Sequence, residues 1–159
     1  MLLAKQIIEK FQYITCDTKN YTHSELAIKA IQAGCKWIQI RIKNKSKDFI
    51  KNEIEKVKSF IKINDLRNIK IIVNDYVELA KETKVDGVHL GKLDMHPYEA
   101  RKILGKNAII GGTANNFEDI INLVNAEIDY IGLGPFKFTT TKENLENILG
   151  LAGYREIIK

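Results

Sequence analysis

Short apolar segments, each followed by a polar cluster and then by an amphipathic helical pattern, recur six times along this chain of 159 residues. Residues 69–73, for example, are mainly apolar, as expected of a strand buried on both faces. A strand followed by a helix, repeated without a linker, favours parallel strands in one sheet with helices packed against it. The chain is therefore expected to be a single α/β domain over residues 1–159.

The repeating pattern predicts where the strands and helices lie. The expected strands cover residues 11–15, 37–41, 69–73, 87–90, 108–111 and 130–133. The expected helices cover residues 24–33, 46–63, 77–83, 97–104, 117–124 and 151–158. Gly34 closes the first helix and Pro97 opens the fourth, which are positions where these residues are favoured.

Two architectures accommodate such units, a (β/α)₈ barrel and an open doubly wound sheet. Polar clusters stand at nearly every strand end, whereas a doubly wound sheet concentrates its site near one switch point. The glycine-rich turn G-x-G-x-x-G of dinucleotide-binding folds is absent. We therefore expect an α/β fold of the (β/α)₈ TIM-barrel type, of which this chain supplies about six βα units.

Composition narrows the function classes. The net charge is +5, and much of the excess falls in residues 43–70, on a long helix whose basic face is expected to be solvated. Because no nucleic-acid motif or aromatic-lined basic stripe is present, nucleic acid is not expected as a partner. No apolar run approaches a membrane span and the first residues lack a signal-peptide layout, so we expect a cytoplasmic protein. Cys16 and Cys35 are expected to be separate buried thiols.

The polar clusters are expected to meet at one face, because successive parallel strands bring their C-terminal ends together. The clusters are residues 39–43, 74–75, 89–94, 111–113 and 132–135, the last followed by 139–142. They supply acids, Lys and Arg, small hydroxyls and glycines, which suit a magnesium-bound, phosphorylated substrate.

Individual residues refine this hypothesis. Asp75 and Asp94 end successive βα units, so both carboxylates could reach one Mg²⁺, unless either caps a helix instead. Gln39, Arg41 and Lys43 alternate along one strand and so face one side, where buried polar groups are costly unless they bind something. A partly solvated strand end is the alternative for these three.

In combination, these motifs resemble the thiamine phosphate synthase family, which also includes the thiazole tautomerases. The resemblance runs from about Tyr13 to Ile158. Its motifs are Q-I-R-I-K at 39–43, V-N-D at 73–75, D-G-V-H-L-G-x-x-D at 86–94, I-I-G-G-T at 109–113, D-Y-I-G-L-G-P at 129–135 and T-T-T-K at 139–142. Each is weak alone, but their order and spacing are specific.

The resemblance implies a magnesium-dependent transferase of thiamine biosynthesis. The reaction joins hydroxymethylpyrimidine pyrophosphate to thiazole phosphate: departure of pyrophosphate leaves a pyrimidine carbocation, which the thiazole nitrogen captures. By resemblance Asp75 and Asp94 bind the metal and Asn74 contacts the pyrophosphate. The residues that hold the pyrimidine pyrophosphate are then Gln39, Arg41 and Lys43.

The resemblance also assigns roles near the fifth and sixth strands. Thr113 stands near the pyrimidine pyrophosphate and Lys142 reaches the leaving pyrophosphate, so both are expected to be catalytic and substrate-binding. Thr139 and Thr141 match the hydroxyls that hold the thiazole phosphate, although a plain polar turn is the alternative. His89, within the fourth-strand motif, is expected to be a packing histidine.

Two further functions stay open beside the synthase. The tautomerases use a histidine where this chain has Asn115, which cannot titrate near neutral pH, so the synthase is favoured. The family barrel has eight strands, and the last two usually hold a phosphate. The chain is therefore expected to be C-terminally incomplete, as a fragment, as a naturally truncated and inactive protein, or as a barrel completed by a partner chain or a second copy. A non-catalytic phosphate-binding or interaction module is the third function.

Overall fold

The structure is a computed structural model that describes residues 8–138 and 147–157. Its strands are β1 Tyr13–Ile14, β2 Trp37–Ile40, β3 Lys70–Asn74, β4 Gly87–Leu90, β5 Ile109–Ala114 and β6 Tyr130–Leu133. Its helices are α1 His23–Gln32, α2 Lys47–Ile63, α3 Val77–Thr83, α4 Pro97–Leu104, α5 Phe117–Asn125 and α6 Gly150–Ile157. The expected alternation of strands and helices is confirmed, with every expected element present.

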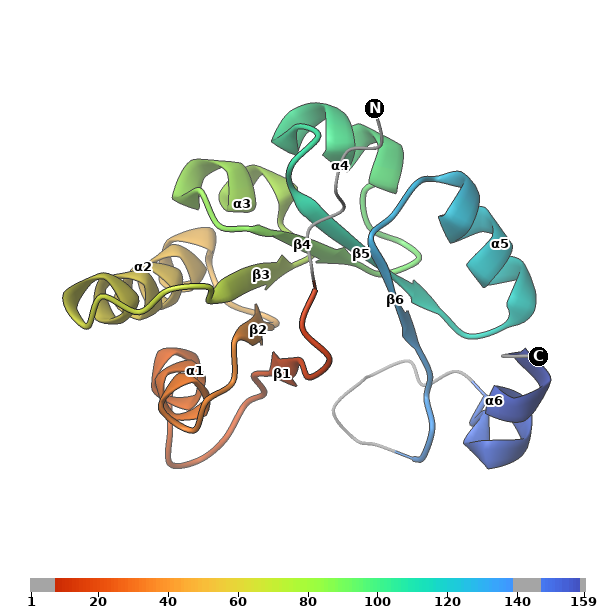
Figure 1. The fold of residues 1–159 in the computed structure, drawn as a ribbon, viewed down its shortest axis with the longest axis horizontal. Coiled ribbons are helices and arrows are strands. Elements are labelled where there is room, and N and C mark those ends of the chain that lie inside the picture. The colour runs from red at the N-terminus through yellow and green to blue at the C-terminus, as the bar shows by residue number, and fades with distance from the viewer. Residues whose placement is uncertain (1–7, 139–146, 158–159) are drawn as a thin grey trace.

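The strands form one parallel sheet in the order of the sequence, from β1 to β6. A doubly wound sheet would reverse its strand order at a switch point, and this sheet does not. The helices lie in an arc along the outer side of the curved sheet (Figure 1). The fold is therefore the expected TIM-barrel type, represented by six βα units in the described residues.

Alternation along the strands gives the sheet two different faces. Ile38 and Ile40 of β2 belong to the main core, together with Ile54 of α2 and other residues of the helices. Trp37 of β2 belongs to a second cluster with Ile72 of β3 and Ile109 of β5. Because neighbouring residues of a strand point to opposite faces, the second cluster lies on the inner side of the sheet. The next residues along the same inner face lead to the strand ends where the site lies.

Side-chain caps mark the starts of several helices. Thr22 and Glu25 form a capping box at the start of α1, and Ser46 and Asn116 accept backbone hydrogen bonds at the starts of α2 and α5. These caps begin each helix directly after a strand-end loop. The loops lie at the C-terminal edge of the sheet, because each follows the C-terminal end of a strand.

Two strands differ from the expected bounds by more than one residue at an end, and β2 and β3 differ by one residue. The first was expected over residues 11–15 but covers only Tyr13–Ile14, because among the described residues it pairs with β2 alone. The fifth was expected to end at Gly111 but continues to Ala114, since it pairs with both β4 and β6. The glycines of I-I-G-G-T therefore lie within a strand and do not form a turn.

Packing explains why glycine stands at these strand positions. A Cβ on Gly111 would lie 2.1 Å from the ring of Tyr130, and one on Gly132 would lie 2.9 Å from the ring of His89. Packing therefore explains the lack of a side chain at Gly111 and Gly132. They make room for two polar rings on the inner face.

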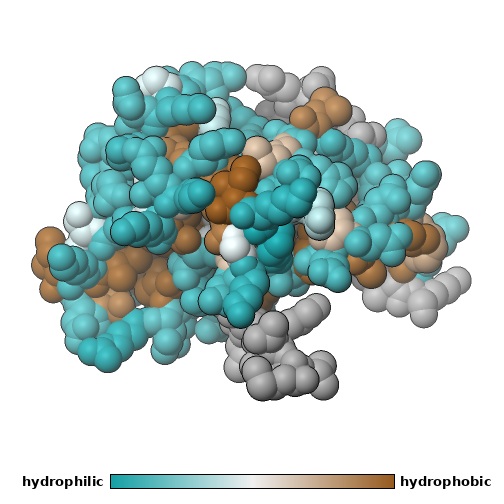
Figure 2. Space-filling view, turned by 90° about the horizontal axis from the view of Figure 1, so that it is seen from above, coloured by the Kyte–Doolittle hydropathy of each residue, from teal (hydrophilic) through white to brown (hydrophobic). Residues whose placement is uncertain are grey.

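The surface agrees with the composition. In Figure 2 hydrophilic residues cover most of one face, and hydrophobic residues gather in separate patches between them. No helix of the described segments is long and apolar enough to cross a membrane. Cys16 and Cys35 are free thiols as expected, but both are half-buried rather than buried.

Candidate functional site

The ends of β2 and β3 bring Lys43 and Asp75 together. Asp75 directly follows β3 and has a left-handed backbone (φ 67°), a conformation that Asp tolerates better than most residues. Its N–H donates to the carbonyl of His89 at 2.9 Å, which ties it to β4. Its Oδ2 accepts a hydrogen bond from Lys43 Nζ. The carboxylate of Asp75 is thus fixed between two strand ends.

Asp94, on the loop after β4, completes a pair of carboxyl groups. Its Oδ2 accepts a hydrogen bond from the Gly91 N–H at 2.6 Å. Partial desolvation and the neighbouring carboxyl of Asp75 raise the pKa of Asp94 above its ordinary value. Two carboxylates that repel each other in one place are the setting in which a bound cation is most strongly stabilised.

Neither carboxylate caps a helix, which was the alternative for both. Tyr76 is the N-cap of α3 and makes no side-chain capping bond, and His96 is the N-cap of α4. Among the described residues no group of three or more His, Cys, Asp or Glu side chains is arranged to hold a metal ion. Mg²⁺ needs only one or two carboxylates, because waters and phosphate oxygens supply its remaining ligands. The donor set of Asp75 and Asp94 therefore fits Mg²⁺.

Buried amide groups lie on the inner face below these acids. Gln39 of β2 is 1% exposed and its Nε2 has no hydrogen-bond partner, and Asn74 of β3 is also buried. A buried donor without an acceptor is destabilising unless a bound group supplies one. Arg41 and Lys43 continue the expected polar run, but they lie in the loop beyond the end of β2.

Thr113 of β5 is held by a hydrogen-bonded network on the inner face. Thr113 Oγ1 lies 3.0 Å from His89 Nε2, and His89 Nδ1 lies 3.1 Å from the hydroxyl of Tyr130. That hydroxyl also accepts from Gln12 Nε2 at 3.3 Å. Burial raises the pKa of Tyr130, so its hydroxyl stays protonated.

The network gives His89 a place that the sequence did not indicate. The His89 ring is hydrogen-bonded at both nitrogens, to the Tyr130 hydroxyl and to Thr113 Oγ1. His89 is therefore a packing histidine, as expected, and in addition it orients a predicted site residue. The available signal was its register on β4, beside Asn74 of β3 and Gly111 of β5.

A second set of contacts links the ends of β4, β5 and β6. Asp119 of α5 accepts from Lys92 at 2.8 Å and from the Asn115 N–H at 2.8 Å. Burial opposes ionisation of Asp119, but these hydrogen bonds outweigh it and hold its pKa below the ordinary value. Asn115 Nδ2 in turn donates to the carbonyl of Gly134, just after β6. Asn115 is therefore a structural link between two strand-end loops.

One cavity lies at this edge of the sheet, and a larger one lies at the opposite edge. One of about 250 Å³ is lined by Asp94 and Thr113 together with Lys92 and Asp119, so two predicted site residues share it. A larger hollow of about 930 Å³ lies beside β1 and the C-terminal end of α1, at the opposite ends of the strands. Sites of barrel enzymes lie at the C-terminal strand ends, so the smaller cavity is the relevant one.

Thr139, Thr141 and Lys142 lie outside the described residues. The segments on either side of them meet at the end of β6, since the Leu149 N–H donates to the Pro135 carbonyl at 2.9 Å. Tyr154 of α6 also donates to the carbonyl of Leu133. The described segments on either side of residues 139–146 therefore lie at the same edge of the sheet as Asp75 and Thr113.

Known proteins resemble this chain over most of its length. A family model described as thiamine monophosphate synthase matches residues 11–159. A thiamine-phosphate synthase of Bacteroides fragilis is 49% identical over 147 residues, which is 92% of this chain and 71% of that protein. One from Bacteroides thetaiotaomicron is 47% identical over 92% of this chain and 69% of that protein.

A solved structure agrees with these relatives. The thiamine phosphate pyrophosphorylase from Pyrococcus furiosus matches with a TM-score of 0.76 and 27% identity, over 92% of this chain and 68% of that one. The chain thus spans roughly 70% of the length of the curated relatives it matches. The fold, the strand-end motifs and these matches agree, and the chain belongs to the thiamine monophosphate synthase family.

Proposed function

We propose that the protein is a thiamine-phosphate synthase, a transferase that joins hydroxymethylpyrimidine pyrophosphate to thiazole phosphate and releases pyrophosphate. The observation that carries the proposal is the cluster of Asp75, Asp94 and Lys43 at the C-terminal strand ends, together with the buried Gln39, whose amide nitrogen has no hydrogen-bond partner. Relatives that are 47% and 49% identical carry that name. The lysine and the metal-binding carboxylates suit the charged pyrophosphate group of the substrate, and the buried Gln39 amide suits its heterocyclic ring.

Asp75 and Asp94 would hold the Mg²⁺ of this site. Bound there, the ion would neutralise charge on the pyrophosphate group and make it a better leaving group. Lys43 pairs with Asp75 in this structure and so stands within reach of a phosphate oxygen bound beside that carboxylate. Arg41 and Asn74 are proposed to bind the same pyrophosphate, and Lys142 to bind it as it leaves.

Residues of the inner face would hold the pyrimidine half of the substrate. The Gln39 amide can donate to a ring nitrogen, which would supply its missing acceptor. The Thr113 hydroxyl, oriented by His89, can donate its hydrogen to a phosphate oxygen. When the bond between the pyrimidine's methylene carbon and the pyrophosphate oxygen breaks, the pyrophosphate departs with the electron pair. The negative charge that develops on the pyrophosphate is then stabilised by the hydrogen bond from Thr113. Thr139 and Thr141 are proposed to bind the thiazole phosphate.

The two other functions gain no support from the site. A tautomerase needs an acid or base where Asn115 stands, and its amide is engaged with the Gly134 carbonyl. A non-catalytic module would not need a pair of acids beside a buried amide. We infer a cytoplasmic enzyme with small phosphorylated substrates, and a second copy or a completing chain stays a hypothesis about its assembly.

The direct test is turnover of both substrates with Mg²⁺ by the wild-type protein and by Asp75→Ala. We expect the wild type to release pyrophosphate and Asp75→Ala to lose at least about a hundredfold in kcat, because the metal would keep one carboxylate at most. Lys51→Ala is a matched control, since Lys51 pairs with Glu82 on the helices away from the strand ends. Full turnover by Asp75→Ala would overturn the metal assignment, and no turnover by the wild type would overturn the function.

A further inference from the structure

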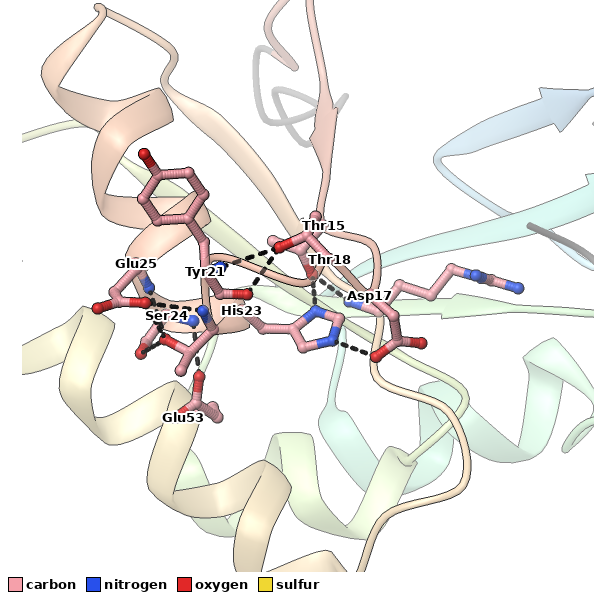
Figure 3. Close-up of polar contacts among 10 residues, drawn as sticks. Thr15, Asp17, Thr18, Tyr21, His23, Ser24, Glu25 and Glu53 are labelled. Carbon is pink, nitrogen blue, oxygen red and sulfur yellow. Dashed lines mark hydrogen bonds and ion pairs between the residues drawn. The ribbon is translucent and has the colours of Figure 1, made fainter. Parts of the chain in front are cut away.

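A buried histidine stands at the start of α1, outside the acid cluster and outside every motif described above. His23 is the first residue of α1 and is 5% exposed. Both of its ring nitrogens have polar partners: Nδ1 lies 2.8 Å from Thr15 Oγ1, and Nε2 lies 3.1 Å from Asp17 Oδ1. Figure 3 shows the ring between these two residues of the loop that follows β1.

The partner Thr15 connects this histidine to the proposed pyrophosphate site. Thr15 is fully buried just after β1, and its N–H donates to the Gln39 carbonyl at 2.9 Å. Its Oγ1 accepts the backbone N–H of Arg41 at 3.0 Å. One threonine thus holds the backbone on either side of Ile40, at two residues proposed to bind the substrate.

The Thr15 hydroxyl makes two contacts at once. Its Oγ1 accepts the Arg41 N–H and is also hydrogen-bonded to Nδ1 of the His23 ring. The other ring nitrogen, Nε2, contacts the Asp17 carboxylate. Because Nδ1 contacts the Thr15 hydroxyl, that hydroxyl is held in the rotamer in which its oxygen faces Arg41.

Helix stability does not account for this arrangement. The start of α1 already has a capping box of Thr22 and Glu25, and the Ser24 N–H donates to Glu53 at 2.7 Å. The His23 side chain serves none of these groups and turns instead toward the strand ends (Figure 3). Because β1 pairs with β2 over two residues only, the side-chain contact extends the attachment to the loop after β2.

We propose that His23 is a positioning residue for this site, which acts through the Thr15 hydroxyl on the backbone of Arg41. The proposal rests on the proposed function, in which Arg41 binds the pyrophosphate group. A backbone held at its N–H presents the following side chain in one direction, so less order has to be imposed when the anion binds. Loss of the contact is expected to weaken pyrophosphate binding and leave the fold in place.

Four variants test the two ring-nitrogen contacts of His23 separately. In His23→Asn the amide oxygen can replace Nδ1 and keep the Thr15 contact, whereas in His23→Gln the longer amide replaces Nε2 and keeps only the Asp17 contact. Thr15→Val removes the acceptor of the Arg41 N–H at nearly constant shape. Glu25→Ala is the matched control, because it damages the capping box of the same helix without contacting Thr15 or Arg41.

The first readout is the affinity of the protein for inorganic pyrophosphate in the presence of Mg²⁺, measured by titration calorimetry. We expect His23→Gln and Thr15→Val to lose about tenfold in affinity, the scale of one hydrogen bond, and His23→Asn to stay within about twofold of wild type. Glu25→Ala should lower the unfolding midpoint without changing this affinity. Equal losses in His23→Asn and His23→Gln, or a loss in Glu25→Ala that matches them, would overturn the proposal.

The second readout is the amide proton of Arg41 in NMR spectra, which reports the contact without substrate or activity. We expect its chemical shift to move in His23→Gln and Thr15→Val and to be retained in His23→Asn. An unchanged shift in His23→Gln would contradict the positioning role even if the enzyme is active. Conversely, a wild type without turnover but with the expected shifts would reject the proposed function alone.

Discussion

At the scale of single residues, the acid pair shows how one arrangement can oppose stability and serve binding. Asp94 and Asp75 repel each other, and the pKa of Asp94 is raised by partial desolvation and by that neighbouring carboxyl. Lys43 offsets part of this charge through its pair with Asp75. Such a cost is typical of sites in which a ligand supplies the compensating charge.

Removing one of the two acids should therefore stabilise the metal-free protein. Because the pKa of Asp94 in the folded state lies above its unfolded value of 3.8, ionisation of Asp94 costs stability above that raised pKa and nothing well below pH 3.8. Asp94→Asn should raise the free energy of unfolding in EDTA at pH 7, and the gain should vanish toward pH 3. Urea unfolding at both pH values measures it.

Added Mg²⁺ supplies the control for this prediction. Wild type should gain stability from the ion by mass action, and Asp94→Asn should gain much less, because one carboxylate is gone. If Asp94→Asn is less stable than wild type in EDTA at pH 7, carboxylate repulsion does not govern this pair.

At the scale of elements, the glycines of β5 show how a strand adapts to a polar interior. Gly111 faces the ring of Tyr130, which packs edge-on against Trp37 with ring centroids 4.8 Å apart and hydrogen-bonds to His89. The Tyr130 ring therefore has little freedom to move. Gly112, its neighbour on the opposite face, meets only the flexible end of Leu123.

The two neighbouring glycines should respond differently to the same substitution. Gly111→Ala would place a Cβ 2.1 Å from the Tyr130 ring, and overpacking of this kind costs about 2–3 kcal/mol. Gly112→Ala should cost less than about 1.5 kcal/mol, because Leu123 can change its rotamer. Denaturant unfolding of both variants tests this, and equal destabilisation would contradict the packing role given to Tyr130.

At the scale of the whole molecule, the site depends on contacts between βα units that are distant in sequence. Lys92, Asp119, Asn115 and Gly134 link the ends of β4, β5 and β6. Thr15 and Arg41 link the ends of β1 and β2 in a corresponding way. The strand-end loops are thereby held as one edge, although each belongs to a different unit.

The contact between Asn115 and Gly134 leads to a prediction about how the two substrates respond to a mutation. Asn115→Ala should loosen the attachment at Gly134 and raise the KM for thiazole phosphate about fivefold, while the affinity for pyrophosphate with Mg²⁺ stays near wild type. Asn116→Ala is the control, because it removes the α5 cap without contacting Gly134. Steady-state kinetics with each substrate varied in turn will show whether only the KM for thiazole phosphate rises. An equal rise in KM for both substrates would contradict this role of Asn115.

Much of this could be read from the sequence, and the reason lies in local physics. The helix start at Pro97 and the strand Tyr130–Leu133 were predicted correctly, and the helix start at Ser46 to within one residue, because capping groups and apolar periodicity act within a few residues. The neighbourhood of Asp75 and Asp94 was predicted because parallel strand ends must meet. The roles of Thr139, Thr141 and Lys142 stay predictions.

The sequence by itself determined the order of the elements, the barrel type and which polar residues stand at strand ends, since each of these depends on chain-local pattern. Only the tertiary structure decided that His89 orients Thr113, that Gly111 yields space to Tyr130, and that Thr15 joins His23 to Arg41. These pairs are separated by 8 to 26 residues in the chain. Their contacts depend on strand register and on which way each side chain points, and both are set by packing between units rather than by the residues' neighbours in sequence.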